Sequence, residues 1–201
     1  MGIILEGNFV NMLSDSSNSL EKNQNQEKYI DYIEGHRERV KASYEKYFLP
    51  LLDKEDLELN TCSVEDFKEA IKEAINNIEL HDESKYMDVE FEPYRIRFYP
   101  TEEEKEALQN ADNSQQQEEN FEVAWTHHFK NNPHHPEYWI QEDGTSRDMD
   151  LRYIIEMLCD WLSFGDDIRV WYQNKGQSVK KAMSTRTREI TEELMGIIYN
   201  E

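Results

Sequence analysis

The histidines of this chain are concentrated in one short stretch. Four of the six, His127, His128, His134 and His135, fall within nine residues that aromatic side chains flank on both sides. Imidazole is the commonest protein ligand for transition metals and also a ready general base. Two pairs of histidines in one polar and aromatic stretch therefore predict a metal site, and they require a fold that brings these side chains to a common place.

The first of the two other histidines lies on the apolar face of a predicted helix. From Tyr29 to about Leu52, the residues Tyr29, Ile33, His36 and Val40 recur at spacings of four, three and four. This spacing places them on one side of an α-helix. We therefore expect His36 to face the protein core.

Two further predicted helices carry the remaining candidates. The helix from Ser63 to about Tyr86 brings His81 and Asp82 three and four residues after its last core isoleucine, so at least one of them faces inward. The helix from Met149 to about Phe164 has a strong apolar face and carries Asp160 near its end. The sequence thus predicts an all-α fold, a helical bundle around a His/Asp metal site.

The rest of the chain predicts one domain with attached segments. Residues 1–27 are expected to form a flexible leader, and residues 28–201 a single helical domain. An acidic, glutamine-rich insertion is expected near 101–120, with a capping box at its start. We expect residues 88–100 to be a connecting loop with a short helical or extended turn, and residues 110–120 to be a solvated loop.

The strongly negative net charge limits which partners this protein can bind. The net charge is −21, from 43 acidic and 22 basic residues, which argues against a nucleic-acid polymer as the main partner. Small anionic substrates are still allowed, because a bound metal or a basic patch can reverse the local field. Six basic residues and no acidic one lie between Arg169 and Arg188, and Arg169, Lys175 and Lys180 are candidates for contacting a substrate phosphate. The alternative is a solvated face that balances the acidic surface.

The cysteines and the apolar segments indicate the setting. Cys62 and Cys159 form neither a disulfide framework nor a zinc motif, and two such cysteines fit a reducing, cytoplasmic location. No apolar run has the length of a membrane span or a signal peptide, so no membrane partner is expected. A homo-oligomer is compatible with the sequence.

The geometry expected for the helix and for the turn limits which histidine of each pair can bind metal. Adjacent residues on a helix diverge by about 100°, so only one of His127 and His128 can easily face the site. Pro133 and Pro136 are expected to hold the second pair in a turn. We predict that His128 binds metal together with either His134 or His135, and the choice within the second pair stays open.

In order and type, these residues resemble the HD-domain superfamily of metal-dependent phosphohydrolases. The resemblance implies a set of ligands for one metal, which is matched here by His36, His81, Asp82 and Asp160. Members that hold two metals have additional histidines, matched by His128 and one of His134 or His135. Lys85 stands where the superfamily often has a lysine, although Ser84 replaces the usual preceding glycine.

The resemblance is closer to an uncharacterised family of bacterial and phage proteins. The family's motifs are His-Asp-x-Ser-Lys, His-x-x-x-Asn-x-His-His-x-x-Tyr-Trp and Glu-Met-x-x-Asp-Trp, after a histidine on the first helix. They are matched here from His36 to Trp161, and the similarity extends over residues 30–199. What it implies is a helical domain with a metal site, without a defined activity.

The residues suit a divalent transition metal. Imidazoles mixed with carboxylates favour one or two ions of Mn²⁺, Fe²⁺, Co²⁺, Ni²⁺ or Zn²⁺ over Mg²⁺ or Ca²⁺ alone. Asp82 is the natural bridge between two ions, Lys85 could stabilise a leaving phosphate, and Glu156 could orient a ligand histidine.

Three functions follow as hypotheses. The first is a metal-dependent phosphohydrolase that acts on a nucleotide or another small phosphorylated compound through a metal-activated water. The second is a non-enzymatic helical protein with a structural metal or histidine cluster, and the third is an HD-type di-iron oxygenase. Fold resemblance does not decide among them.

Overall fold

The structure is a computed structural model that describes residues 5–165, 167–174 and 176–199. It confirms the predicted all-α class and the helical bundle, since none of these residues belongs to a β-strand. An isolated bridge between Ile140 and Ser146 is the single strand-like pairing in this part of the chain.

The described residues divide into two compact units, where the sequence predicts one domain over 28–201. The first unit contains residues up to Glu34 together with Lys85–His127. The second contains Gly35–Ser84 and the chain from His128 onward.

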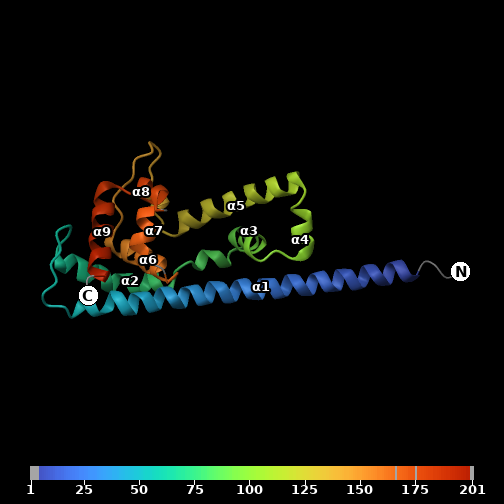
Figure 1. The fold of residues 1–201 in the computed structure, drawn as a ribbon, viewed down its shortest axis with the longest axis horizontal. Helices are drawn as coiled ribbons and strands as arrows, with labels where there is room; N and C mark the ends of the chain where they lie inside the picture. The colour runs from blue at the N-terminus through green and yellow to red at the C-terminus, as the bar shows by residue number, and fades with distance from the viewer. Residues whose placement is uncertain (1–4, 166, 175, 200–201) are drawn as a thin grey trace. The chain divides into compact units, whose positions relative to one another are not determined.

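The helix α1 spans Leu5–Tyr47 without a break (Figure 1). Its buried residues include Tyr29, Ile33, His36 and Val40, which confirms the predicted apolar face. The helix begins well before Tyr29, so the leader predicted for residues 1–27 is helical from Leu5, and residues 1–4 lie outside the described part. This start was missed because residues 14–28 are polar and lack the apolar spacing by which a helix is recognised.

In the first unit, α1 is joined by α3 (Asp88–Phe98), α4 (Glu102–Ala107) and most of α5 (Ala111–Asn131). Its small core is largely aromatic and consists of Tyr29, Ile33, Tyr94 and Ala124, with Phe91, Tyr99 and Phe121 packed against it. This unit therefore has its own hydrophobic centre, distinct from that of the second unit.

Two predicted loops of this unit are helices. Residues 88–100 were expected to form a connecting loop with only a short helical or extended turn, but they contain the 11-residue helix α3, which tolerates Pro93 in its interior. Residues 110–120 were expected to be solvated but form the start of α5, where the Asn110 side chain accepts from the N–H groups of Asp112 and Asn113. Such caps stabilise a polar helix without an apolar face.

The acidic insertion is held by one buried cation. Thr101 and Glu104 form the predicted capping box at the start of α4. Glu104 also pairs with the fully buried guanidinium of Arg95, which Glu92 contacts from one turn earlier. The segment near 101–120 is therefore tied into the first unit by paired charges.

The second unit is built from the later part of α1, three short 3₁₀ helices and five α-helices. These are η1 (Leu49–Leu52), α2 (Val64–Glu79), η2 (Glu83–Tyr86, through Ser84), η3 (Pro136–Trp139), α6 (Leu151–Leu162), α7 (Ile168–Asn174), α8 (Gln177–Ala182) and α9 (Thr185–Tyr199).

Helices α2 and α6 form the centre of the second unit. Their fully buried residues include Phe67, Ile71, Ile154 and Ile155, and the hydroxyl of Tyr44 on α1 donates to the carbonyl of Ile71 at 2.7 Å. Ser63 caps α2 by accepting from the Asp66 N–H, as the sequence predicts. Four of the eight site residues described below lie on α6 or directly after α2.

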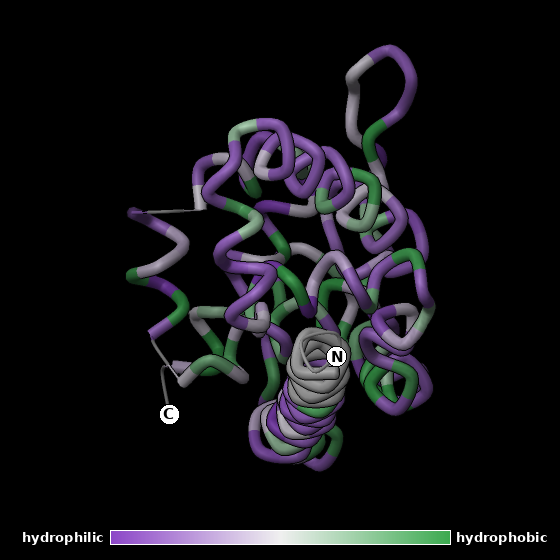
Figure 2. The backbone as a smooth tube through the Cα atoms, turned by 90° about the vertical axis from the view of Figure 1, so that its right-hand side faces the viewer, coloured by the Kyte–Doolittle hydropathy of each residue, from purple (hydrophilic) through white to green (hydrophobic). Residues whose placement is uncertain are grey.

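Hydrophobic and hydrophilic residues alternate along the helices (Figure 2). Within the part of the chain that the structure describes, no helix combines the length and the apolar character needed to cross a membrane.

We predict that Ile154→Ala lowers the free energy of unfolding by about 2–5 kcal/mol, because it opens a cavity at a fully buried position. The matched control is Ile140→Ala, whose side chain is 43% exposed, with an expected change within about 0.5 kcal/mol. Denaturant unfolding followed by circular dichroism would measure both. Equal effects of the two substitutions would contradict the α2–α6 core.

Candidate metal centre

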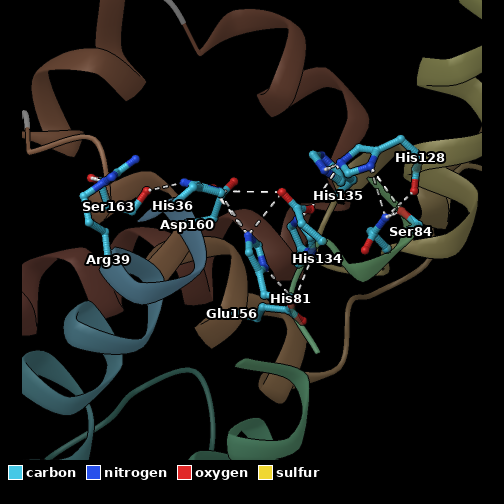
Figure 3. Close-up of polar contacts among 12 residues, drawn as sticks. His36, Arg39, His81, Ser84, His128, His134, His135, Glu156, Asp160 and Ser163 are labelled. Carbon is cyan, nitrogen blue, oxygen red and sulfur yellow. Dashed lines mark hydrogen bonds and ion pairs between the residues drawn. The ribbon is translucent and has the colours of Figure 1, made fainter. Parts of the chain in front are cut away.

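The second unit brings together the histidines and acids from distant parts of the sequence (Figure 3). They come from α1, from the turn after α2, from α5, from the turn before η3 and from α6, in the order His36, His81, Asp82, His128, His134, His135, Glu156 and Asp160. Five elements of the second unit thus converge on one buried cluster.

The turn after α2 is where the backbone is most unusual. Asp82 has φ +57°, the one positive value at a non-glycine residue in the described chain. Aspartate tolerates this left-handed conformation better than most residues, and such strain is concentrated at functional sites. Because the helix has already ended at Glu79, the chain can bury both His81 and Asp82, where the sequence required only one to face inward.

The first group of ligand atoms surrounds the Nε2 atoms of His36 and His81, which are 3.3 Å apart. Oδ1 of Asp160 lies 3.1 Å from the His36 nitrogen and 3.7 Å from that of His81. Oδ2 of Asp82 lies 3.6 Å from both nitrogens. Two imidazole nitrogens and two carboxylate oxygens therefore face one another.

The second group lies at the other oxygen of Asp82. Oδ1 is 3.3 Å from Nε2 of His128 and 3.6 Å from Nε2 of His134. Nε2 of His135 is 2.9 Å from Nε2 of His128. Both members of the second pair thus reach the cluster, because the residues between α5 and η3 form a turn and not a helix. The two oxygens of Asp82 are divided between the two groups.

These distances fit a shared metal ion. Ligand atoms about 2.0–2.2 Å from one ion lie roughly 2.9–3.5 Å apart at tetrahedral or octahedral angles. The atoms of each group lie close to this spacing. Nε2 of His134 is moreover buried without a hydrogen-bond partner among the described residues. Buried His, Asp and Glu groups of this protein could hold a metal ion.

Glu156 is hydrogen-bonded to one histidine of the first group and lies beside one histidine of the second. Its Oε1 accepts from Nδ1 of His81 at 2.9 Å and lies 3.0 Å from Nδ1 of His134, the latter at an angle poorer than that of a hydrogen bond. An acceptor at Nδ1 keeps the proton there and leaves Nε2 bare for a metal. Glu156 is thus placed to position ligands, as the sequence analysis suggested.

A serine hydroxyl lies beside one further histidine of each group. Oγ of Ser163 is 3.2 Å from Nδ1 of His36. Oγ of Ser84 is 3.4 Å from Nδ1 of His128 and accepts from the Asn132 amide at 2.7 Å. Each group therefore contains one histidine beside a hydroxyl and one beside the Glu156 carboxylate.

The first histidine pair is divided as predicted. The side chain of His128 is only 2% exposed and lies in the cluster, whereas that of His127 is 30% exposed. Nδ1 of His127 lies 2.6 Å from the buried carboxylate of Glu90, in the first unit. His127 therefore serves a separate ion pair.

The cluster has the electrostatics of a cation site. Burial lowers the pKa of His81, but the charge of Asp82 and hydrogen bonds to Asp160 and Glu156 raise it to about 10. Burial raises the pKa of Asp160, but hydrogen bonds from His36 and His81 hold it well below its usual range. Buried carboxylates of this kind need positive charge, which protons supply in the absence of a metal.

Solvent reaches the cluster at one ligand of each group. Asp160 is 15% exposed at its side chain, and His135 is half-buried, while the other ligands are almost fully buried. Burial, reinforced by His134 and His128, lowers the pKa of His135 well below its usual value, so it is neutral at pH 7. Each group thus has an accessible edge.

The predicted phosphate-binding cations are not among these residues. Lys85 belongs to the first unit, where its Nζ lies 5.8 Å from the centre of the Tyr94 ring. Arg169 pairs with Asp167, and Lys180 lies over the Tyr172 ring. Arg169 and Lys180 both line one hollow, and none of the described residues that line this hollow belongs to the cluster. Lys175 lies outside the described residues.

Sequence reasoning missed a cation and an aromatic ring at the cluster. The exposed Arg39, one turn after His36, donates from Nε to the Ser163 carbonyl at 3.2 Å (Figure 3). Phe164 packs on His36 with ring centres 5.3 Å apart. Arg39 could have been found from its spacing of three to His36, but Phe164 depends on how α6 ends.

We predict that His128→Ala lowers metal affinity by more than about 100-fold, a loss at least as large as that of a residue supporting a ligand. His127→Ala, the neighbouring control, should leave affinity within about threefold, because His127 contacts Glu90 instead. Metal content after dialysis would distinguish them. A site emptied by His127→Ala and not by His128→Ala would show that the assignment is reversed.

Metal uptake should release protons. At pH 8 the metal-free His81 is protonated because its pKa is about 10, and a metal on Nε2 requires the neutral ring. We expect about one proton from this residue for the ion bound in the first group at pH 8, and an affinity of that group that increases with pH. Calorimetry in buffers of different ionisation enthalpy would count the protons, with His81→Gln as the control. Binding without proton release at pH 8 would be inconsistent with this account.

The comparisons with known proteins place the chain in a family. No curated protein and no solved structure matches it. A family model matches residues 25–200, which include every residue of the cluster. The chain therefore belongs to the family of unknown function DUF5662.

Proposed function

We propose that this protein is a metal-dependent phosphohydrolase that acts on a small phosphorylated compound. The observation that carries the proposal is the division of Asp82 between two groups of imidazoles, which suits two ions on either side of one carboxylate. Paired metal sites are a recurrent solution for displacement at phosphorus.

The ligand set suggests the metal. Five imidazoles and two carboxylates favour Mn²⁺, Fe²⁺, Co²⁺, Ni²⁺ or Zn²⁺, with one ion in each group. When bound, such ions acidify a coordinated water so that hydroxide is present near neutral pH.

The protein residues would fix and complete this centre. Asp82 would hold both groups together, and Glu156 would keep the rings of His81 and His134 turned toward them. The neutral His135, at an accessible edge, could bind a metal or accept a proton.

Arg39 is the best-placed cation for a substrate phosphate. Its side chain is exposed, its Nε is held by the Ser163 carbonyl, and it forms no ion pair with a carboxylate of the described chain. Ser163 also lies beside His36, so the guanidinium is linked to the first group through one residue. An arginine can bind a phosphate through two N–H groups.

Two alternatives are weaker. A purely structural metal would be expected to have closed coordination, whereas Asp160 and His135 leave both groups accessible. An HD-type di-iron oxygenase would use the same ligand types, and metal analysis with iron spectroscopy separates it from a hydrolase. The resemblance to HD-domain phosphohydrolases supports the hydrolase. The free thiols of Cys62 and Cys159 support the cytoplasmic location that we also propose.

Asp82→Asn tests the function. Asparagine tolerates the positive φ of residue 82, so the variant should stay helical while losing one negative charge between the groups. We expect metal affinity and phosphate release from a panel of phosphate monoesters to fall by at least about 100-fold. The control is Asp56→Asn, at an exposed position.

The panel would be tested with each of the five metals. Phosphate release by the wild type that is lost in Asp82→Asn and kept in Asp56→Asn would support the proposal. If no metal-loaded preparation of the wild type releases phosphate, or if Asp82→Asn is fully active, the phosphohydrolase assignment is wrong.

A further inference from the structure

A hollow lined by aromatic side chains lies at the end of α6. It is formed by Trp161, Phe164, Ile168 and Trp171, and its volume is about 350 Å³. The Trp161 and Trp171 rings are 5.0 Å apart at their centres and are tilted by 54°. Hollows of this size with mainly aromatic walls are typical of small-molecule sites.

This hollow adjoins the first group of metal ligands. Phe164 lines it and also packs on the ring of His36, with an angle of 33° between the planes. Trp161 lines it and directly follows Asp160, the ligand that is accessible to solvent. A molecule whose phosphate contacts a metal ion held by this group would therefore have the hollow beside it.

The exposure of Phe164 is consistent with a binding role. Its side chain is 59% exposed although it is a large hydrophobic residue, while Ile168, which also lines the hollow, is buried. The exposed cation Arg39 is bonded to Ser163, the residue before Phe164. The anionic group of one ligand could thus meet Arg39 while the apolar ring of the same ligand meets Phe164.

We propose that this hollow is the site for a planar ring carried by the phosphorylated substrate. The inference rests on the proposed function and adds to it a substrate class, a ring-bearing phosphate monoester. Flat rings pack on aromatic side chains in offset-stacked or edge-to-face arrangements, and such packing adds affinity without requiring particular hydrogen bonds. The ring would contact Phe164 and Trp171, and the phosphate would be held by Arg39 and by a metal ion bound in the first group.

The experiment compares ligands that differ only in the ring. Metal-loaded protein is titrated with the four common nucleoside 5′-monophosphates and with ribose 5-phosphate, and binding is followed by calorimetry. At least one nucleotide should bind about tenfold or more tightly than ribose 5-phosphate, as expected for stacking of one base.

Two variants test whether the preference for nucleotides over ribose 5-phosphate arises in the hollow. Phe164→Ala and Trp171→Leu should each reduce the advantage of the nucleotide to less than about threefold and leave ribose 5-phosphate affinity within about twofold. Among the described residues the ring of Trp171 pairs with Trp161, which is not a cluster residue. Trp171→Leu is therefore the deciding variant if Phe164→Ala loses metal. Phe98→Ala, which removes a phenylalanine of similar exposure from the first unit, is the control and should keep the preference.

Two binding results would overturn the inference that the hollow holds a ring. One is equal affinity of ribose 5-phosphate and all four nucleotides, and the other is a preference that survives both Phe164→Ala and Trp171→Leu. Phosphate release is measured separately: equal release with and without a ring would remove the ring site and keep the hydrolase. Preferential binding abolished by these variants, without release from any ligand, would keep the ring site and remove the hydrolase.

Discussion

The second unit depends on the way in which one carboxylate is buried between two sets of imidazoles. Asp82 lies within 3.6 Å of four Nε2 atoms, two at each oxygen. A carboxylate is costly to bury unless cations compensate it, so the surrounding histidines must carry protons or a metal. The same demand accounts for the early end of α2 and for the positive φ at residue 82, which turn Asp82 inward directly after His81.

The two groups have the same kinds of side chain beside two of their histidines. In each group, one histidine has a serine hydroxyl near its Nδ1 and another has Oε1 of Glu156 near its Nδ1. A carboxylate at Nδ1 makes an imidazole a stronger donor to a metal than a neutral hydroxyl does. The groups share this arrangement of supporting side chains and differ in a third ligand, which is Asp160 in the first group and His135 in the second. The repeated arrangement suits one ion in each group.

Some of these features could be read from the sequence, and others could not. The spacing around His36 predicts its burial, and the divergence of adjacent helical residues predicts that His128 and not His127 enters the cluster. The joint entry of His134 and His135 was not predictable, because it depends on an irregular turn. The start of α5 was missed because its stability comes from side-chain hydrogen bonds and not from an apolar face. Lys85 was favoured by resemblance, whereas Arg39 is the cation that the structure links to the cluster.

The central claim is that the protein holds two ions on either side of Asp82. Anomalous diffraction from crystals of the metal-loaded protein, recorded at the absorption edge of the bound metal, tests it most directly. The account predicts two peaks about 3.5–4 Å apart, the separation typical of two-metal sites. One peak should lie among His36, His81 and Asp160, and the other among His128, His134 and His135. A single peak bounded by Glu156, or no peak within ligand distance of Asp82, would contradict it.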